Sequence, residues 1–380
     1  MPEQIPIKCV IMRGGTSKGV IFREQDLPRD AKERERLILS LMGSPDPRQI
    51  DGLGGADPLT SKICIIGPGA QHDADVDYTF GQVGIEEPFV ALTTNCGNLS
   101  AAVGVYAIEE GYVAAQEPIT TVRIYNTNTK QLLLAHVPVQ AGRPSVTGNY
   151  AIPGVPGSGA EIRLDFSRTT GSTTGKLLPT GNRRDTLFVP KLGRSVEVSI
   201  LDVAKPTVYF RAEEVGITGT EGPEAFTQDI LDRFWAIREA AAEAIGLGKK
   251  SRVPTPVAVA PPASYTNYMT KAVIPALSMS FTARRVLGPP PRVHKAFAAT
   301  GAVCTAVAAQ MRGTVLNDVY VDRGGGIVRI GHPTGVFPVY ARLGPDDAVL
   351  EVSYSRTARR LMEGTAYVTA ASLALPAAAE

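Results

Sequence analysis

Two stretches of the chain are apolar on every side over the length of a helix. The first follows Cys96 and ends before Gly111, and the second follows Thr300 and ends before Gly313. This pattern is typical of a helix buried in its domain, whereas a surface helix carries one apolar stripe. The two stretches begin about two hundred residues apart, close to half the chain. The spacing predicts an internal duplication with one buried helix in each half.

Two other segments have the single apolar stripe of a surface helix. Segment 28–43 begins with Pro28 and Asp30, ends at Gly43, and has a charged side opposite a short apolar stripe. These residue types are typical of a helix start and stop. Segment 223–246 has apolar residues at helical spacing and also ends at a glycine. We expect a helix at the surface of the fold in both places.

Runs rich in β-branched residues recur along the chain, with Gly and Pro between them. In the second hundred residues and beyond, these runs are 121–127, 132–140, 146–152, 161–166, 186–190, 196–204 and 206–212. Segment 72–84 alternates acidic and apolar residues, which favours an edge strand, whereas 254–268 is proline-rich and is expected to be a loop. The pattern predicts a mixed, mostly antiparallel sheet and an α+β fold.

The length of the chain predicts two domains, because 380 residues exceed one typical domain. Segment 167–184 is polar and glycine-rich, and we interpret it as the interdomain region or an active-site lid. The expected domains are therefore 1–184 and 185–380. The sequence leaves open whether the last strand returns to the first domain.

Composition narrows the class of protein. The chain has 39 Lys and Arg against 37 Asp and Glu, so it has no basic field that would favour nucleic acid. No apolar run is long enough to span a bilayer, and the N-terminus lacks the regions of a signal peptide. We expect a cytoplasmic protein that binds neither nucleic acid nor membrane. A homo-oligomer stays open.

Candidate metal ligands do not form a metal-binding pattern. The four cysteines show no CxxC pair and no Cys/His spacing typical of zinc. Asp73, Asp75 and Asp77 resemble the first half of a calcium loop. Tyr78, however, stands at the glycine position of such a loop, and Gly84 stands at the position of its closing glutamate. We therefore expect no metal ion.

The start of the first buried helix carries candidate chemistry in Asn95, Cys96, Gly97 and Asn98. The first turn of a helix has unpaired N–H groups and positive dipole charge, which favour a thiolate, a bound carboxylate or an enolate. Most unpaired cysteines pack in the core, and this alternative applies to any single cysteine. Because Asn and Gly flank Cys96 and usually serve exposed backbone, we interpret Cys96 as catalytic.

Two glycine-containing loops supply further polar groups. The first is formed by Arg13, Gly14, Gly15, Thr16, Ser17 and Lys18. Its cations and hydroxyls suit a carboxylate or phosphate, although a plain hairpin has the same composition. The second loop leads through Thr60 and Ser61 to Lys62, at the start of an apolar strand. Most lysines are solvated, but an amine that is desolvated in this way is a candidate general base.

The second buried helix begins with small residues, including Thr300 and Gly301, a few residues after His294. If the two helix starts face one cleft, their dipoles converge on one ligand, and a small polyanion fits best. His294 and Lys295 could line that cleft. A histidine in such a turn is more often structural, and this interpretation also stays open.

Five spaced motifs resemble the signature of a known family. They are MRGGTSKG at 12–19, DGLGGADPLTSK at 51–62, NCGN at 95–98, TGAVC at 300–304 and RIGHPTG at 329–335. With these motifs the chain resembles the 2-methylaconitate cis-trans isomerase (PrpF) family over nearly its whole length. DADVDYTFGQV at 73–83 and RTARRLMEG at 356–364 are similar to its branch of methylitaconate Δ-isomerase and 4-oxalomesaconate tautomerase.

The resemblance implies a diaminopimelate epimerase-like fold of two pseudo-symmetric domains, each a mostly antiparallel β-barrel around a central buried helix. It also implies a cofactor-free 1,3-allylic proton shift that moves a C=C bond in a small unsaturated di- or tricarboxylate. Methylitaconate, 2-methylaconitate, aconitate and 4-oxalomesaconate all fit this description. The acid/base pair of the family matches Lys62 and Cys96. The expected substrate-binding residues are Arg13, Gly14, Gly15, Thr16, Ser17, Lys18, Thr60, Ser61, Asn95, Gly97, Asn98, His294, Thr300 and Gly301.

Three different functions stay open beside this one. A racemase or epimerase of the same fold would use two cysteines, but superposing Gly97 on Gly301 puts Thr300 at the second position and Cys304 inside the helix. A threonine hydroxyl is too weak an acid to replace a thiol. A non-catalytic accessory protein of an iron–sulfur dehydratase and a polycarboxylate-binding module are the second and third, and the presence of both Lys62 and Cys96 argues against them.

Overall fold

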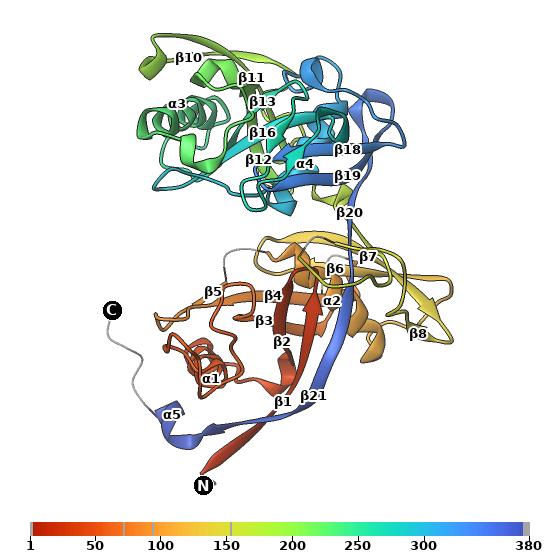
Figure 1. Cartoon of the computed structure of the whole chain (residues 1–380). Coiled ribbons are helices and arrows are strands. Elements are labelled where there is room, and N and C mark those ends of the chain that lie inside the picture. The colour runs from red at the N-terminus through yellow and green to blue at the C-terminus, as the bar shows by residue number, and fades with distance from the viewer. Residues whose placement is uncertain (1–2, 71–72, 93–94, 153, 375–380) are drawn as a thin grey trace. The chain divides into compact units, whose positions relative to one another are not determined.

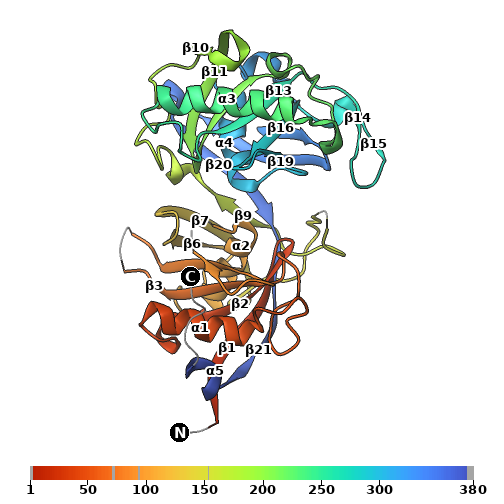
Figure 2. The same cartoon turned by 90° about the vertical axis from the view of Figure 1, so that its left-hand side faces the viewer.

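The structure, a computed structural model, describes residues 3–70, 73–92, 95–152 and 154–374 (Figures 1 and 2). The chain divides into two compact units. Unit 1 is Met1–Leu164 together with Ser355–Glu380, and unit 2 is Asp165–Tyr354. Both units combine a mixed sheet with helices, so the fold is α+β, as the sequence predicts.

Unit 1 is built on a hairpin, two parallel crossovers and a buried helix. Strands β1 and β2 are antiparallel, β3 is parallel to β2, β4 is antiparallel to β3, β6 is parallel to β4, and β7 is antiparallel to β6. Helix α1 (Ala31–Met42) connects β2 to β3, and helix α2 (Gly97–Glu109) lies in the connection from β4 to β6. The strands are β1 (Gln4–Gly14), β2 (Ser17–Arg23), β3 (Lys62–Pro68), β4 (Val76–Val83), β5 (Val90–Ala91), β6 (Ile119–Asn126), β7 (Gln131–Gln140), β8 (Arg143–Pro144), β9 (Ile162–Asp165) and β21 (Ala358–Thr369).

Unit 2 repeats this order of elements. Strands β11 and β12 form the hairpin, β13 is parallel to β12, β16 is antiparallel to β13, β18 is parallel to β16, and β19 is antiparallel to β18. Helix α3 (Gln228–Ala244) takes the place of α1, and helix α4 (Ala299–Gln310) takes the place of α2. The strands are β10 (Asp185–Val189), β11 (Arg194–Val203), β12 (Lys205–Arg211), β13 (Thr255–Ala260), β14 (Tyr265–Thr266), β15 (Val273–Ile274), β16 (Phe281–Leu287), β17 (Arg292–Val293), β18 (Ile327–His332), β19 (Gly335–Leu343) and β20 (Val349–Arg356).

The central helix of each unit is surrounded by its sheet, whereas the crossover helix lies on the outside (Figures 1 and 2). Eleven of the 13 residues of α2 are buried, against four of the 12 residues of α1. In unit 2, nine of the 12 residues of α4 are buried, against five of the 17 residues of α3. The two stretches that are apolar on every side are therefore the central helices, and the striped segments are the outer ones.

The outer helices close a second apolar layer over each sheet. In unit 1, Leu37, Ile38 and Leu41 of α1 pack against buried residues of β2 and β3. In unit 2, Phe234 and Ile237 of α3 pack against β11, β12 and β13. Burying one large aliphatic or aromatic side chain contributes about 1.5–3 kcal/mol, so the stripe that is visible in the sequence holds each outer helix to its sheet.

The division between the units differs from the boundary expected after residue 184. Segment 167–184, expected to be an interdomain region or lid, belongs to unit 2. Its turn is fixed by the carboxylate of Asp202, which accepts hydrogen bonds from the amides of Thr173 and Thr174 at 2.8 and 2.7 Å. A buried carboxylate on β11 therefore anchors this polar segment, which the composition alone did not show.

The last strand returns to unit 1. Strand β21 runs antiparallel to β1 over its whole length, with Ile7 opposite Ala366 and Gly14 opposite Ala358. Helix α5 (Ala370–Ala374) follows it and contacts α1. The side chain of Ser372 in α5 lies 2.8 Å from that of Ser40, oxygen to oxygen.

Three expectations for individual segments were wrong. Segment 72–84, expected to be an edge strand, contains β4, which pairs with β3, β5 and β6 and buries Tyr78 and Phe80. Segment 146–152 is a loop apart from an isolated bridge at Tyr150. Segment 254–268, expected to be a loop, contains the fully buried strand β13. In this strand Pro256 lies opposite Val208 of β12, so the pairing of the two strands accepts a proline.

No helix in the described part of the chain has the length and apolarity that a membrane crossing requires. Among the same described residues, no group of three or more His, Cys, Asp or Glu side chains is arranged to hold a metal ion. Asp73 and Asp75 instead form ion pairs with Arg123.

Candidate active site

The two central helices begin without a side-chain cap, unlike the two outer helices. Asp30 caps α1 by accepting a hydrogen bond from the amide of Glu33, and Thr227 caps α3 in the same way. At the N-caps of α2 and α4, which are Cys96 and Ala298, no described side chain plays this role. The first-turn amides of both central helices are therefore available to an anion from outside the helix.

The β1–β2 hairpin packs against the first turn of α2, and two glycines allow this contact. A Cβ atom at Gly14 would lie 2.4 Å from the carbonyl oxygen of Asn98. A Cβ atom at Gly15, where φ is +52°, would lie 2.3 Å from Oδ1 of the same residue. Both glycines are needed because the hairpin backbone touches the helix, so their part in the site is to bring the hairpin to Cys96.

Polar side chains of this hairpin contact the helix start directly. The Cys96 thiol lies 3.9 Å from Oγ of Ser17, a residue that is only 2% exposed. The side-chain nitrogen Nδ2 of Asn98 donates to the hydroxyls of Thr16 and Ser17 at 3.0 and 3.4 Å. The structure therefore brings together four of the predicted residues, two from the hairpin and two from α2.

Arg356 also belongs to this group, although no pattern in the sequence selected it. Its Nε donates to Oδ1 of Asn98 at 2.8 Å, and its side chain lies against Gly15. Arg356 stands at the start of the RTARR motif, but nothing local shows that this residue contacts a helix 258 positions earlier. The guanidinium adds positive charge to the first turn of α2.

Asn95, just before Cys96, lies partly buried between two neighbours. Its Oδ1 is 3.4 Å from Oγ of Ser100 and 3.5 Å from Nδ2 of Asn126. Its own Nδ2 is buried and has no hydrogen-bond partner in the part of the chain that the structure describes. A buried amide donor without a partner is costly, and a ligand oxygen at the helix start would satisfy it.

Lys62 is the first residue of β3 and is 8% exposed. Its amine donates to Oε1 of Gln82 at 2.5 Å and lies 5.1 Å from the centre of the Phe80 ring. The amide nitrogen of Gln82 donates to the carbonyl groups of Ser61 and Pro58, at 3.0 and 3.2 Å, and so orients its oxygen toward the amine. Gln82 was not selected from the sequence, because its role depends on the pairing of β3 with β4.

The charges of Lys62 and Cys96 both influence the pKa of the buried thiol of Cys64. Side chains alternate along a strand, so Lys62 and Cys64 share one face of β3. Burial raises the pKa of Cys64 well above its usual range, with Cys96 raising it further and Lys62 lowering it. The charges of both residues thus influence the pKa of one buried thiol, although the two residues lie on different elements.

Arg13, another predicted residue of unit 1, makes hydrogen bonds to backbone carbonyl groups. Arg13 donates to the carbonyl groups of Gly15 and Thr357 at 2.9 Å. It also lines a pocket of about 630 Å³ formed with Arg359 and residues from 146–152 and 155–159, and neither Lys62 nor Cys96 is among its lining residues. Burial lowers the pKa of Arg13, and the charge of Arg359 adds to this effect. Arg13 thus lies on the face of β1 opposite Gly14.

The remaining predicted residues of the two loops, Ser61, Thr60 and Lys18, differ in burial. Ser61 is fully buried and donates to Oε1 of Gln49 at 2.6 Å, so its hydroxyl fixes the loop. The hydroxyl of Thr60 lies 3.3 Å from the carbonyl oxygen of Asp57. Lys18 is partly exposed, and its amide donates to the carbonyl oxygen of Leu59 at 3.0 Å.

In unit 2, Thr300 and Gly301 lie in the first turn of α4. His294 precedes the helix, and its Nδ1 accepts a hydrogen bond from the amide of Ala296 at 3.0 Å. Burial lowers the pKa of His294 to about 4, and the charge of Arg285 contributes to this shift. His294 is therefore a neutral, partly buried side chain at neutral pH, which suits a hydrogen-bonding or structural role better than an ionic one.

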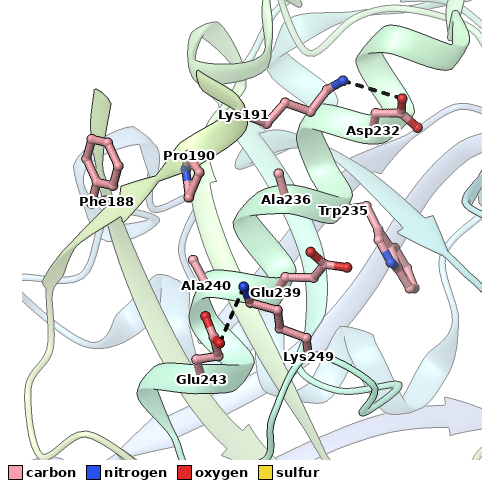
Figure 3. Close-up of a pocket in the computed structure, with 10 residues that line it drawn as sticks. All are labelled: Phe188, Pro190, Lys191, Asp232, Trp235, Ala236, Glu239, Ala240, Glu243 and Lys249. Atoms are coloured by element: carbon pink, nitrogen blue, oxygen red, sulfur yellow. Dashed lines mark hydrogen bonds and ion pairs between the residues drawn. The ribbon is translucent and has the colours of Figure 1, made fainter. Parts of the chain in front are cut away.

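The pocket on the outer face of α3 contains none of the predicted residues (Figure 3). Its volume is about 450 Å³, and Trp235 and Lys249 are among the residues that line it. Lys249 and Glu243 point toward each other in this view and form an ion pair at 3.5 Å. The pocket is thus a hollow between α3 and β10, and no residue of the central helix α4 lines it.

Comparison with known proteins gives a consistent result. The sequence profile described as PrpF protein matches residues 4–369. The chain is 45% identical to 3-methylitaconate isomerase of Eubacterium barkeri over 98% of this chain and 100% of the relative. It is 39% identical to 2-methyl-aconitate isomerase of Shewanella oneidensis over 96% of this chain and 97% of the relative.

A solved structure is similar over its full length. The crystal structure of methylitaconate-delta-isomerase superposes with a TM-score of 0.90 at 44% sequence identity. The match covers 100% of this chain and 99% of that chain.

Proposed function

Because the chain belongs to the PrpF protein family, we propose that it is an isomerase that shifts a C=C bond in a small unsaturated di- or tricarboxylate. The relatives described above are named for reactions on methylitaconate and 2-methylaconitate. Aconitate and 4-oxalomesaconate carry the same conjugated carboxylate and belong to the same class of substrate. The site has to bind carboxylates and move one proton.

The reaction is a 1,3-allylic proton transfer. A base takes a proton from the carbon next to one end of the C=C bond, and the electron pair delocalises into the conjugated carboxylate as a dienolate. An acid then delivers a proton to the far carbon of the allyl unit. One C–H bond breaks and another forms, so the substrate keeps its charge and its hydrogen count, and no oxidant or cofactor takes part.

Lys62 and Cys96 are the proposed acid/base pair. The observation that supports this assignment is the packing of Gly19, where a Cβ atom would lie 2.9 Å from Leu99 in the first turn of α2 and 3.2 Å from the carbonyl oxygen of Lys62. The Lys62 amine is also buried and contacts Gln82. One partner takes the proton in its unprotonated form, and the other delivers a proton from its protonated form. Both groups are of the types that general acid–base catalysis uses.

The first turn of α2 would stabilise the dienolate. Its uncapped backbone amides follow Cys96, and the guanidinium of Arg356 lies against the side chain of Asn98 in the same turn. Oriented donors in a protected site favour developing negative charge. The unpartnered Nδ2 of Asn95 is a further donor for a substrate carboxylate. Ser17 and Thr16 hold Asn98 in place and complete this side of the site.

The proposal extends to the remaining predicted features. The repeated order of strands and helices in the two units supports a diaminopimelate epimerase-like fold, with a β-barrel around each central helix. His294, Thr300 and Gly301 are proposed binding residues of unit 2, and the place of action is proposed to be the cytoplasm. A racemase that used two thiols is disfavoured, because Thr300 stands at the start of α4 and Cys304 is fully buried within it.

Proton NMR in heavy water tests the proposed function directly. The four candidate acids are incubated with the wild type, Cys96→Ser and Lys62→Ala, and deuterium entry and double-bond migration are followed. We expect both processes with at least one acid in the wild type, and their loss in both variants. Cys9→Ala is the matched control, because Cys9 is buried in β1 and has no assigned role. Absence of exchange with all four acids would contradict the isomerase assignment.

A further inference from the structure

Arg285 is a buried cation without a counter-ion in the described part of unit 2. The residue lies on β16, is 3% exposed, and takes part in none of the ion pairs among the described residues. Its Nε and Nη1 atoms are buried and have no hydrogen-bond partner among the described residues. The N–H donors of a guanidinium are normally paired with carboxylate or carbonyl oxygens. The buried donors of Arg285 without an acceptor therefore require an explanation.

The unpartnered guanidinium lies against the start of α4. A Cβ atom at Gly301 would lie 2.1 Å from Nη1 of Arg285 and 2.8 Å from Cζ. Gly301 is the third residue of the helix, so the guanidinium of Arg285 packs against the first turn of α4, whose N-cap has no side-chain hydrogen bond. Only glycine at this position leaves room for the guanidinium, which explains why the helix start is made of small residues.

The described surroundings of Arg285 add positive charge, and no described carboxylate forms an ion pair with it. Lys205, at the start of β12, is partly buried, and burial together with the charges of Arg285 and Arg252 lowers its pKa to about 8. Burial lowers the pKa of Arg285 itself to about 10, while Tyr209 and Cys304 act in the opposite direction. The ring of Phe297 lies 5.9 Å from the guanidinium carbon.

We propose that Arg285 and the first turn of α4 form a binding site for one carboxylate group of a small polycarboxylate. The carboxylate would accept hydrogen bonds from Nε or Nη1 and from first-turn amides, which satisfies the orphaned donors and neutralises the buried charge. The choice of a polycarboxylate as ligand rests on the proposed function, whereas the need for an anion follows from unit 2 alone.

A ligand-binding role and a structural role make opposite predictions for stability. A buried charge without a partner costs free energy in the ligand-free protein, so a structural explanation would need a partner that the described residues do not provide. If Arg285 waits for a ligand, Arg285→Met should raise the Tm of the ligand-free protein by about 2–5 °C. If it holds the fold together, the same change should lower Tm.

Calorimetric titration with propane-1,2,3-tricarboxylate measures the binding. This saturated acid has no C=C bond to shift, so it reports binding whether or not the chain is an isomerase. We expect Arg285→Met to weaken its Kd by about 30- to 100-fold, the loss that follows removal of a charged hydrogen-bond donor. Pentanedioate has one carboxylate fewer. The substitution should weaken its binding less, because this ligand can bind without a carboxylate at Arg285.

Two further variants complete the experiment. Gly301→Ala places a methyl group on the guanidinium and should weaken binding of the tricarboxylate while keeping the charge. Arg233→Gln removes an exposed arginine of α3, whose ion pair with Asp229 lies at 2.5 Å, and should leave binding unchanged.

Either of two outcomes would overturn the site. One is an unchanged Kd in Arg285→Met, or no binding of the tricarboxylate by the wild type. The other is a Tm of Arg285→Met that falls, including a variant that does not fold. Binding as expected without double-bond migration in the NMR experiment would instead contradict the proposed function and leave the carboxylate site standing.

Discussion

The amine of Lys62 lies 2.5 Å from Oε1 of Gln82, and the amide of Gln82 is itself fixed by the carbonyl groups of Ser61 and Pro58. The two residues are directly opposite each other in the β3–β4 ladder. A buried amine with one oriented acceptor has a defined position, which a proton-transferring group needs because small displacements are costly in rate. Gln82 is thus a positioning residue for Lys62.

Replacing Gln82 should affect turnover more than substrate binding. We expect Gln82→Leu to lower kcat about 10-fold or more with little change in KM, because the amine loses its orientation while the carboxylate-binding donors stay in place. Gln82→Glu keeps the acceptor but favours the charged ammonium, so its activity should recover at higher pH. Steady-state rates of double-bond migration across pH measure both effects.

Gln228→Leu is the matched control for this pair of variants. Gln228 lies on α3, and its side chain donates to Asp232 on the exposed face at 2.8 Å. Its loss should leave kcat, KM and the pH profile unchanged. A Gln82→Leu variant with only KM altered would show that Gln82 serves substrate binding and not the position of Lys62.

Cys96 should be the first cysteine to react with iodoacetamide. It is partly exposed at a helix start, whereas Cys9, Cys64 and Cys304 are buried. Peptide mass spectrometry should find the first label on Cys96, with activity lost in proportion, and Cys96→Ser should lower kcat by about 10²- to 10⁴-fold. A bound tricarboxylate should slow the labelling. Equal labelling of Cys9 at early times would contradict the picture of Cys96 as the accessible thiol.

Gly14→Ala should destabilise unit 1 strongly. The added methyl group would meet the backbone of Asn98 at 2.4 Å, and backbone in the first turn of a buried helix cannot move aside cheaply. We expect a loss of about 2–4 kcal/mol in the free energy of unfolding, measured by urea titration. Gly142→Ala is the comparison, because Gly142 has open space around it and only its φ of +71° opposes a side chain, at about 1–2 kcal/mol.

The stability of the protein should fall as the pH drops from about 6.5 toward 4. Burial lowers the pKa of His332 to about 3 and that of His294 to about 4. In this window the unfolded chain binds protons at both histidines while the folded chain does not, so acidification favours unfolding. Each group contributes a slope of up to about 1.4 kcal/mol per pH unit.

His332→Asn should make this slope shallower by the share of one histidine. Unfolding free energies at pH 7, 6 and 5 measure it. His136→Asn is the control, because His136 is partly exposed on β7 and its Nδ1 lies 3.0 Å from the hydroxyl of Thr121. An unchanged slope in His332→Asn would mean that another group accounts for the acid sensitivity.

The sequence alone determined the features that depend on local periodicity. Apolar residues on every side identified α2 and α4, and single stripes identified α1 and α3, because burial is encoded directly in the spacing along a helix. The residue types at helix and strand starts likewise selected Cys96 and Lys62. Spaced motifs then indicated the family to which the chain belongs.

Only the tertiary structure decided which residues surround these two. Gln82 meets Lys62 through strand pairing, and Arg356 meets Asn98 across 258 positions, a distance at which no local pattern carries information. The strands β13 and β16 were missed for a related reason. Pro256, Arg284 and Arg285 interrupt their apolar pattern, and the buried environment that accepts these residues exists only after the sheet has formed.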